Sequence, residues 1–405
     1  MRVLVIHDGE GPLRGADKVA FDLMTGLRPQ GVVWQVATNQ AEFKAAAEQA
    51  GFPSAWMPFR RLFIGGTKWR DLADAVRAFK ALRLLVHDFK PDLIHLNNGG
   101  ACQWAVPAAW LAGVPALVHI HARWSRKMRL LLGLHLPDRI IAVSHASAER
   151  FLGDPVAARK VRVIHNAAAV VAAATPEERA AERAKMDIAP DVFVVAYVGV
   201  LIAGKRPQDA IEAVALLPQA VKQKLVLLFV GDGEVRPELE RAAVGLPVRF
   251  LGYRPDVDRI TRLVCDATIL PSPIEAFPLV LLEAAACGLP RIAAAAAGNL
   301  ESVTDGRDGL LCKPGDIKAY AEAIAKLAAD RSYCLALGEE ARNRVARDFS
   351  PANFLAHFLQ TYQEMRAAPR RSGWAKAADA IRSLLNVGGK FRFGGRAKTP
   401  AKMEM

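Results

Sequence analysis

The sequence predicts an α/β protein of two doubly wound domains with a cleft between them, and three observations predict it. The chain has 405 residues, too many for one domain of the usual roughly 100–200 residues. Short β-branched runs alternate with longer segments of helical periodicity, which indicates βαβ units and parallel sheets. An alanine-rich stretch at 167–174 separates two such series and is typical of a linker.

The first series covers residues 1–174 and predicts the N-terminal domain. Its strands are short runs rich in valine, isoleucine and leucine, expected at 2–6, 92–96, 116–120 and 139–143. Segments with helical periodicity lie between them, among them 16–27 and 71–89.

The second series covers 175–350 and begins with a helix start, since Thr175 suits the N-cap and Pro176 the first helical position. Strands are expected at 192–199, 224–231, 248–252, 267–271 and 290–295, and the last helices at 316–328 and 331–347. We expect a helix over 351–366 that packs back on the first domain. A basic, partly disordered tail over 367–405 follows.

Composition limits the classes of partner and compartment. A formal charge of +13 and a pI near 9.7 favour an anionic partner, whether a phosphate ligand, nucleic acid or lipid surface. The five cysteines are scattered singly and suggest neither disulfides nor a zinc site. The first eleven residues lack the length of a signal peptide, and the apolar run 192–204 is shorter than the ~20 residues of a membrane span. We therefore expect a cytoplasmic protein.

A second-domain helix over about 278–287 is predicted to begin without a side-chain cap. Pro278 suits the first helical position and Gly288 the C-terminal cap, but no Ser, Thr, Asp or Asn directly precedes Pro278. The amides around Phe277, Leu279 and Val280 therefore have no obvious partner. An uncapped helix start at the carboxyl edge of a sheet is typical of an anion site.

Glu283 lies inside this apolar helix, eight residues after Glu275. A charge in such surroundings needs a partner. One interpretation is a structural ion pair with an arginine or lysine. The other is a carboxylate that accepts hydrogen bonds from the hydroxyls of a ligand, with Glu275 facing another part of the same ligand.

These residues carry a resemblance that covers both predicted domains. The spacing of Glu275 and Glu283 and the sequence 287–290 resemble the group 1 (family 4) retaining glycosyltransferases, whose GT-B fold has two facing Rossmann-like domains. Further matching stretches are 15–18, 140–147, 228–234, 248–253 and 298–316. The resemblance implies transfer of a sugar from a nucleotide-diphosphate donor to a glycan or lipid-linked hydroxyl, with retained configuration, no metal and no cofactor, in cell-surface polysaccharide or glycolipid synthesis.

The resemblance implies that residues 1–174 form the acceptor-side domain and 175–350 the nucleotide-sugar-binding domain, and it also implies roles for single residues. Glu283 would bind the ribose, Glu275 and His121 would face the transferred sugar, and the amides near Phe277, Leu279 and Val280 would hold the diphosphate. Lys205 would neutralise charge on the leaving phosphate. Gly15 would let the backbone approach a substrate, and Tyr253 lies in a loop that contributes to donor specificity.

Two departures from the family pattern concern the diphosphate. Val200 stands where the family usually has an arginine, so one phosphate contact is missing unless Arg206 or another cation replaces it. Pro278 replaces a glycine and removes an amide donor. The alternative hypothesis is therefore a non-catalytic nucleotide-sugar-binding protein of the same fold.

Three motifs favour structural interpretations. Asp256 and Asp258 form a D-x-D, but they follow Pro255 and suit a helix start. The sequence 231–233 lacks the third glycine of a dinucleotide site. His119 and His121 have no third metal ligand nearby, so we expect no metal site.

Two basic segments raise the hypothesis of an anionic membrane surface. Residues 122–134 combine four cations with Trp124, and 373–385 predict an amphipathic helix with Trp374 and Ile381 on its apolar face. Packing of that helix against the protein is an equal alternative. No basic stripe with interleaved stacking aromatics favours nucleic acid.

Overall fold

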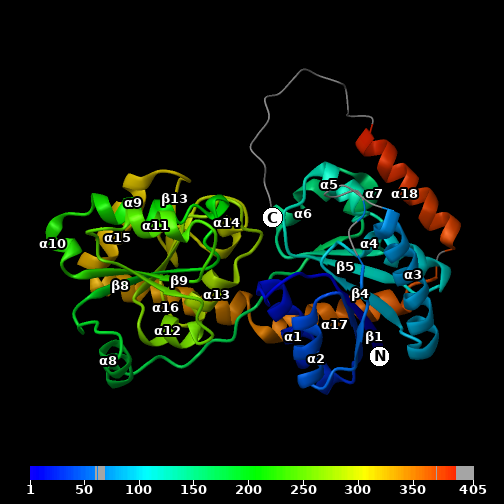
Figure 1. Ribbon diagram of the computed structural model, residues 1–405, viewed down its shortest axis with the longest axis horizontal. Helices are drawn as coiled ribbons and strands as arrows, with labels where there is room; N and C mark the ends of the chain where they lie inside the picture. Colours follow the sequence, from blue (N-terminus) through cyan, green and yellow to red (C-terminus); the bar gives the residue numbers. More distant parts are fainter. Residues whose placement is uncertain (60–61, 63–68, 371, 389–405) are drawn as a thin grey trace.

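The computed structural model describes residues 1–59, 62, 69–370 and 372–388. Figure 1 shows two lobes side by side, each with a parallel sheet flanked by helices. The end of the expected basic tail, from residue 389 on, lies outside the described residues.

The first sheet is parallel, with the strand order β3-β2-β1-β4-β5-β6-β7. Its strands are β1 Arg2–His7, β2 Val33–Thr38, β3 Ser54–Trp56, β4 Leu93–Asn97, β5 Ala116–Ile120, β6 Arg139–Ala142 and β7 Val161–Val163. The helices around it are α1 Gly15–Leu27, α2 Ala41–Gln49, α3 Trp69–Phe89, α4 Cys102–Leu111, α5 Arg126–Leu131, α6 His145–Leu152 and α7 Pro155–Ala158, with the 3-10 turn η1 Arg28–Gln30.

The second sheet is also parallel, with the order β10-β9-β8-β11-β12-β13. Its strands are β8 Phe193–Val198, β9 Leu225–Val230, β10 Val248–Gly252, β11 Ala267–Leu270, β12 Arg291–Ala294 and β13 Gly309–Cys312. Its helices are α8 Pro176–Ala184, α9 Gln208–Leu216, α10 Gln219–Lys222, α11 Arg236–Ala242, α12 Val257–Leu263, α13 Leu279–Ala286, α14 Asn299–Ser302, α15 Ile317–Ala329 and α16 Arg331–Asp348, with the 3-10 turn η2 Ala203–Lys205.

The strand order of each sheet reverses at one place, and ligands of doubly wound sheets bind at such a switch point, beyond the carboxyl ends of the strands. In the first sheet the reversal lies between β1 and β4, and in the second between β8 and β11. The loops that leave these four strands are therefore the places to look for chemistry.

Helix α17 (Pro351–Ala367) belongs to the packing of the first lobe, although it follows the second in sequence (Figure 1). Phe354, Phe358 and Tyr362 lie in the same buried cluster as residues of β1, β2 and α1. The hydroxyl of Tyr362 lies 2.5 Å from Nδ1 of His95 in β4. The chain thus crosses back and links the two lobes a second time.

Helix α18 (Gly373–Gly388) packs against α7 and α4 through its more polar face. Lys376 contacts Asp138 at 2.9 Å, and Ala380 and Ser383 are buried. Trp374 and Ile381 on the other face are 89% and 57% exposed. The helix therefore packs on the protein, yet its predicted apolar face remains accessible.

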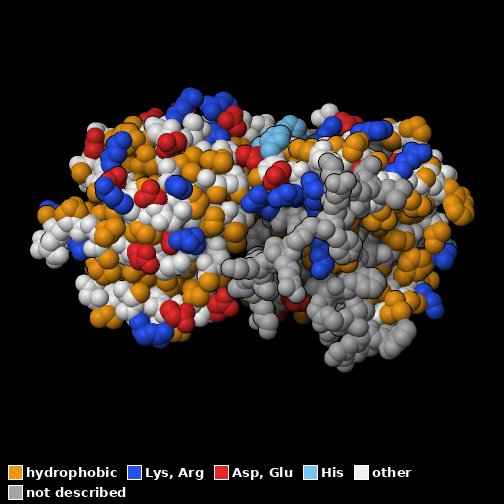
Figure 2. Space-filling model, turned by 90° about the horizontal axis from the view of Figure 1, so that it is seen from above, with side chains coloured by type: hydrophobic (Ala, Val, Ile, Leu, Met, Phe, Trp, Pro, Cys, Tyr) orange, Lys and Arg blue, Asp and Glu red, His pale blue; other side chains and the backbone are white. Residues whose placement is uncertain are grey.

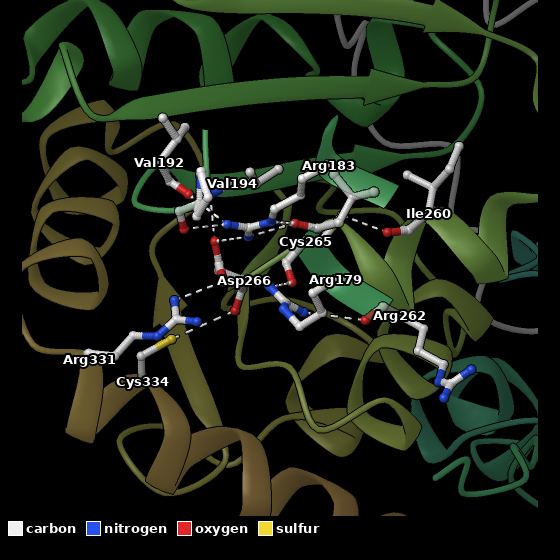
Figure 3. Close-up of polar contacts among 12 residues, drawn as sticks. Arg179, Arg183, Val192, Val194, Ile260, Arg262, Cys265, Asp266, Arg331 and Cys334 are labelled. Carbon is white, nitrogen blue, oxygen red and sulfur yellow. Dashed lines mark hydrogen bonds and ion pairs between the residues drawn. The ribbon is translucent and has the colours of Figure 1, made fainter. Parts of the chain in front are cut away.

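A buried carboxylate ties the start of the second domain to its sheet (Figure 3). Asp266, just before β11, accepts from Arg183 at 2.6 Å, and from Arg179 and Arg331 at 2.8 Å each. The amide of Val194 in β8 donates to the same carboxylate at 2.8 Å. One side chain thus joins α8, β8, β11 and α16.

Candidate active site

The loop between β11 and α13 ends in a helix start without a side-chain cap. Helix α13 begins at Leu279, one residue later than expected, and its N-cap residue Pro278 makes no capping bond. Gly288, with a φ of 76°, follows the other end in the left-handed conformation that favours glycine. The first amides of α13 thus have no side-chain cap, as the sequence predicts, and an uncapped helix start is typical of an anion site.

The conformation of this loop is set by the turn that begins α14. A Cβ on Gly298 would lie 1.7 Å from the carbonyl oxygen of Ala276, so only glycine allows the approach. The Gly298 amide donates to the carbonyl of Glu275 at 2.9 Å, and the side chain of Asn299 donates to that of Ser272 at 2.9 Å. Glu275 is therefore presented on a rigid backbone.

Glu275 forms an ion pair with Lys205, whose Nζ lies 3.0 Å from Oε1. The two side chains are 12% and 26% exposed. Lys205 ends η2, in the loop after β8. A Cβ added to Gly231 or to Gly233, in the loop after β9, would lie within 2.2 Å of a backbone oxygen of the loop after β8. These glycines serve close packing of two loops, which agrees with the rejection of a dinucleotide site.

Glu283 faces the first domain. Its carboxylate pairs with Lys18 of α1, and the two side chains are 31% and 56% exposed. A Cβ on Gly15 would lie 3.2 Å from Cδ1 of Leu279, so the starts of α1 and α13 face each other. The ion-pair interpretation of Glu283 thus describes the structure, but the cation comes from the opposite domain and both groups remain accessible.

The first domain contributes a chain of hydrogen bonds around His121. Nε2 of His121 lies 3.0 Å from Oδ1 of Asn97, and Nδ2 of Asn97 lies 2.9 Å from Nδ1 of His7. Nε2 of His7 in turn lies 2.8 Å from Gln40 and 3.1 Å from Asp17. All of these contacts are satisfied when both histidines carry their proton on Nε2, which leaves Nδ1 of His121 as an acceptor.

The charge state of this group follows from its burial. Desolvation, and then the neighbouring His7, lower the pKa of His121 to about 3, so the ring is neutral at pH 7. Burial alone would raise the pKa of Asp17, but hydrogen bonds from His7 and the Arg14 amide outweigh it and lower the pKa. His121 can therefore accept a hydrogen bond, but it carries no positive charge.

The side chains of the other predicted site residues make different contacts. Phe277 is 4% exposed, its ring packs against Phe349 and its carbonyl accepts from the side chain of Asn166 at 3.0 Å. Val280 packs against the core of the second domain. Arg206 pairs with Asp209 at 2.7 Å, so the structure does not show it replacing the missing arginine at Val200. Tyr253 is 75% exposed directly after β10.

The sequence analysis did not single out five residues: His7, Asp17 and Asn97 of the network around His121, and Lys18 and Glu301 of the contact between the domains. The carboxylate of Glu301 in α14 accepts from the amides of His145 and Ala146 in α6, both at 2.8 Å. His7 and Asn97 directly follow the predicted strands 2–6 and 92–96, and this signal could have identified them.

The D-x-D motif and the histidine pair, for which the sequence favours structural interpretations, occupy structural positions. Asp256 is the N-cap of α12, and two hydrogen bonds from Arg254 at 2.7 Å lower its pKa to about 2. His119 is fully buried beside His121. Across the described part of the chain, no three His, Cys, Asp or Glu side chains are grouped to hold a metal.

The basic segment 122–134 is only partly exposed. Arg129, one of its four cations, is buried and pairs with Asp154 at 3.2 Å, and Trp124 packs against the core of the first domain. Figure 2 shows lysine and arginine side chains gathered near the middle of one face, where the two lobes meet. Within the described ranges, no helix combines the length and apolar character needed to cross a bilayer.

Comparison with known proteins agrees with this geometry. Residues 178–344 match the family model described as Glycosyl transferases group 1, and residues 13–170 match Glycosyltransferase Family 4. The chain is 32% identical over 227 residues to the lipopolysaccharide core biosynthesis glycosyltransferase LpsE of Rhizobium meliloti, covering 55% of this chain and 63% of that protein. It is 32% identical over 259 residues to the D-inositol 3-phosphate glycosyltransferase of Actinosynnema mirum, covering 59% and 60%. The chain thus spans about three fifths of the length of these two relatives.

A solved structure matches more of the chain. Anabaena HepE, in complex with UDP-glucose, superimposes with a TM-score of 0.76 at 24% identity over 90% of this chain and all of that one. The likeness confirms the predicted GT-B arrangement of two Rossmann-like domains. Since the two family models together cover both lobes, the chain belongs to the group 1 glycosyltransferases.

Proposed function

We propose that this protein transfers a sugar from a nucleotide-diphosphate donor to a hydroxyl acceptor, with retention of the anomeric configuration and without a metal. One observation carries the proposal. The Lys205–Glu275 pair lies beside the uncapped start of α13, at the switch point of the second sheet. A cation, a helix start and a carboxylate meet there, which suits a pyrophosphate joined to a sugar.

In this proposal the second domain stabilises the departing nucleotide. The diphosphate lies against the amides of Leu279 and Val280, and Lys205 neutralises the charge that builds on the leaving oxygen. Donors placed in advance for such charge contribute about 10²–10³ in rate apiece. Glu283 accepts hydrogen bonds from the ribose hydroxyls, and Glu275 accepts one from a hydroxyl of the sugar.

The first domain orients the sugar. His121 is neutral, so its free Nδ1 accepts a hydrogen bond from a sugar hydroxyl, while Asn97 holds the ring in place. The acceptor oxygen attacks the anomeric carbon on the face that the diphosphate leaves. Its proton passes to the departing phosphate oxygen, so the configuration is retained without a covalent intermediate.

The relatives support a choice of substrates. The HepE complex contains UDP-glucose, so we propose a uridine-diphosphate sugar as the donor. The likeness to LpsE supports a glycan or lipid-linked acceptor in cell-surface glycan synthesis. Such a role places the protein in the cytoplasm, in contact with the inner face of an anionic membrane.

Donor hydrolysis in the absence of acceptor tests this proposal. We expect the protein to release UDP slowly from UDP-glucose, and ¹H NMR at early times to show α-glucose before mutarotation. The rate should not change in EDTA, since Lys205 and the helix amides supply the positive charge.

The alternative outcomes are distinct. Early β-glucose would contradict retention, and inhibition by EDTA would contradict metal independence. Binding of UDP-glucose without any release of UDP, also with glycan or lipid acceptors added, would favour the non-catalytic binding protein that Val200 suggests.

A further inference from the structure

A second group of cations surrounds a cavity far from the proposed donor site. The cavity has a volume of about 400 Å³ and lies between the first sheet, the end of α17 and helix α18. We call it the rear pocket. Figure 1 shows α18 on the side of the first lobe that faces away from the second.

The rear pocket lies at the opposite edge of the sheet from His121. Asp92, Pro115, Asp138 and Lys160 in its lining directly precede β4, β5, β6 and β7. His121 follows the other end of β5, and a five-residue strand spans roughly 16 Å. The rear pocket is therefore separate from the site where the sugar is transferred.

Cations outnumber carboxylates in its lining. The cationic residues are Arg139, Arg159, Lys160, Arg366, Arg370, Lys376 and Arg382. Each of the three carboxylates already has a cation: Asp138 pairs with Lys376 at 2.9 Å, Asp92 with Arg366 at 3.4 Å and Asp379 with Arg382 at 3.7 Å. The lining thus holds positive charge in excess of its own acidic groups.

Three guanidinium groups have donors to spare. Nε of Arg139 is buried without an acceptor, and its Nη2 lies 3.9 Å from Glu364, a carboxylate that Arg162 contacts at 3.0 Å. Arg159 and Arg370 are exposed and form no ion pair with any described residue. Planar guanidinium groups around a concave space suit the oxygens of a phosphate, which can accept two bonds from one arginine.

We propose that the rear pocket binds a phosphate or pyrophosphate group of an anionic ligand. The ligand is a soluble phosphate compound or the headgroup of a lipid. Either ligand would join α18 to the first sheet and slow the local opening of this helix.

Hydrogen–deuterium exchange of the full chain tests the proposal. We expect inorganic pyrophosphate, or vesicles of phosphatidylcholine with phosphatidic acid but not phosphatidylcholine alone, to slow amide exchange in α18. Protection of the loop 272–278 reports on the donor site and is scored separately.

Two double variants with the same change in charge provide the comparison. Arg159→Ala with Arg370→Ala should weaken the effect on α18 by about tenfold or more, whereas Arg241→Ala with Arg307→Ala, both exposed in the second domain, should not change it. Protection by pyrophosphate identifies a soluble ligand, and protection by the acidic vesicles alone identifies a lipid headgroup. If neither probe slows exchange in α18, or the two double variants behave alike, the proposal is wrong.

Discussion

Replacing Lys205 by alanine is expected to lower kcat by about 10²–10³, with a smaller effect on KM. The lysine lies 3.0 Å from Glu275 at the start of α13, where the leaving phosphate gains charge as the glycosidic bond breaks. An interaction that strengthens in the transition state acts mainly on kcat. Steady-state release of UDP from UDP-glucose, measured over a range of donor concentrations, separates the two constants.

Asp256→Ala is the control for this measurement. Asp256 also pairs with a cation in the second domain, but its partner is Arg254 at a helix start. We expect its kcat to stay close to that of the unaltered protein. A Lys205→Ala variant with kcat within about twofold of wild type would remove this lysine from the mechanism, because one lost transition-state donor costs far more than that.

Asp266→Ala should destabilise the second domain by about 3–5 kcal/mol. The side chains of Asp266 and Arg183 are 1% and 5% exposed, so the substitution would leave buried guanidinium groups without their carboxylate (Figure 3). It would also remove the acceptor of the Val194 amide. The loss should appear as a lower urea midpoint in far-UV circular dichroism.

The distribution of tryptophan makes this test specific to a domain. All seven tryptophans lie outside 175–350, so their fluorescence reports on the first lobe and α18. Asp191→Ala is the matched control, because Asp191 is 66% exposed and its pair with Lys224 is 3.4 Å long. It should cost less than about 1 kcal/mol. Equal midpoints for the two variants would contradict a structural role of Asp266.

Apart from β10, the strands that the sequence predicts are largely buried on both faces. Runs such as those of β1, β5 and β9 are almost entirely apolar because helices cover both sides of the sheet. β3, β7 and β13 escaped prediction because they are short strands at sheet edges, where only one neighbour stabilises them. β2 escaped because Gln35 interrupts its apolar run.

The residues of the candidate site also differ in how far the sequence alone reveals them. Glu275, Glu283 and the start of α13 lie in one stretch of sequence, so their pattern is readable. The network of His121 depends on contacts between residues 24 and 90 positions apart, and the Lys18–Glu283 pair joins residues 265 apart. Only the topology of the two sheets brings such residues together.

Helix α18 shows how a single pairing overrides an amphipathic pattern. Its period predicts an apolar face, and packing through that face would be the usual result. Lys376 instead reaches Asp138, and its side chain is only 10% exposed. The polar face therefore turns toward the protein, and Trp374 and Ile381 turn toward solvent.

The central claim is that the edge of the second domain at α13 binds a nucleotide-linked sugar, and calorimetric titration with UDP tests it most directly. A carboxylate that accepts hydrogen bonds from both ribose hydroxyls should make Glu283→Ala bind at least about tenfold more weakly than wild type. Lys18→Met should bind as tightly as wild type or more tightly, because Lys18 pairs with Glu283 when no donor is bound. Unchanged affinity in Glu283→Ala, or an equal loss in both variants, would contradict the claim.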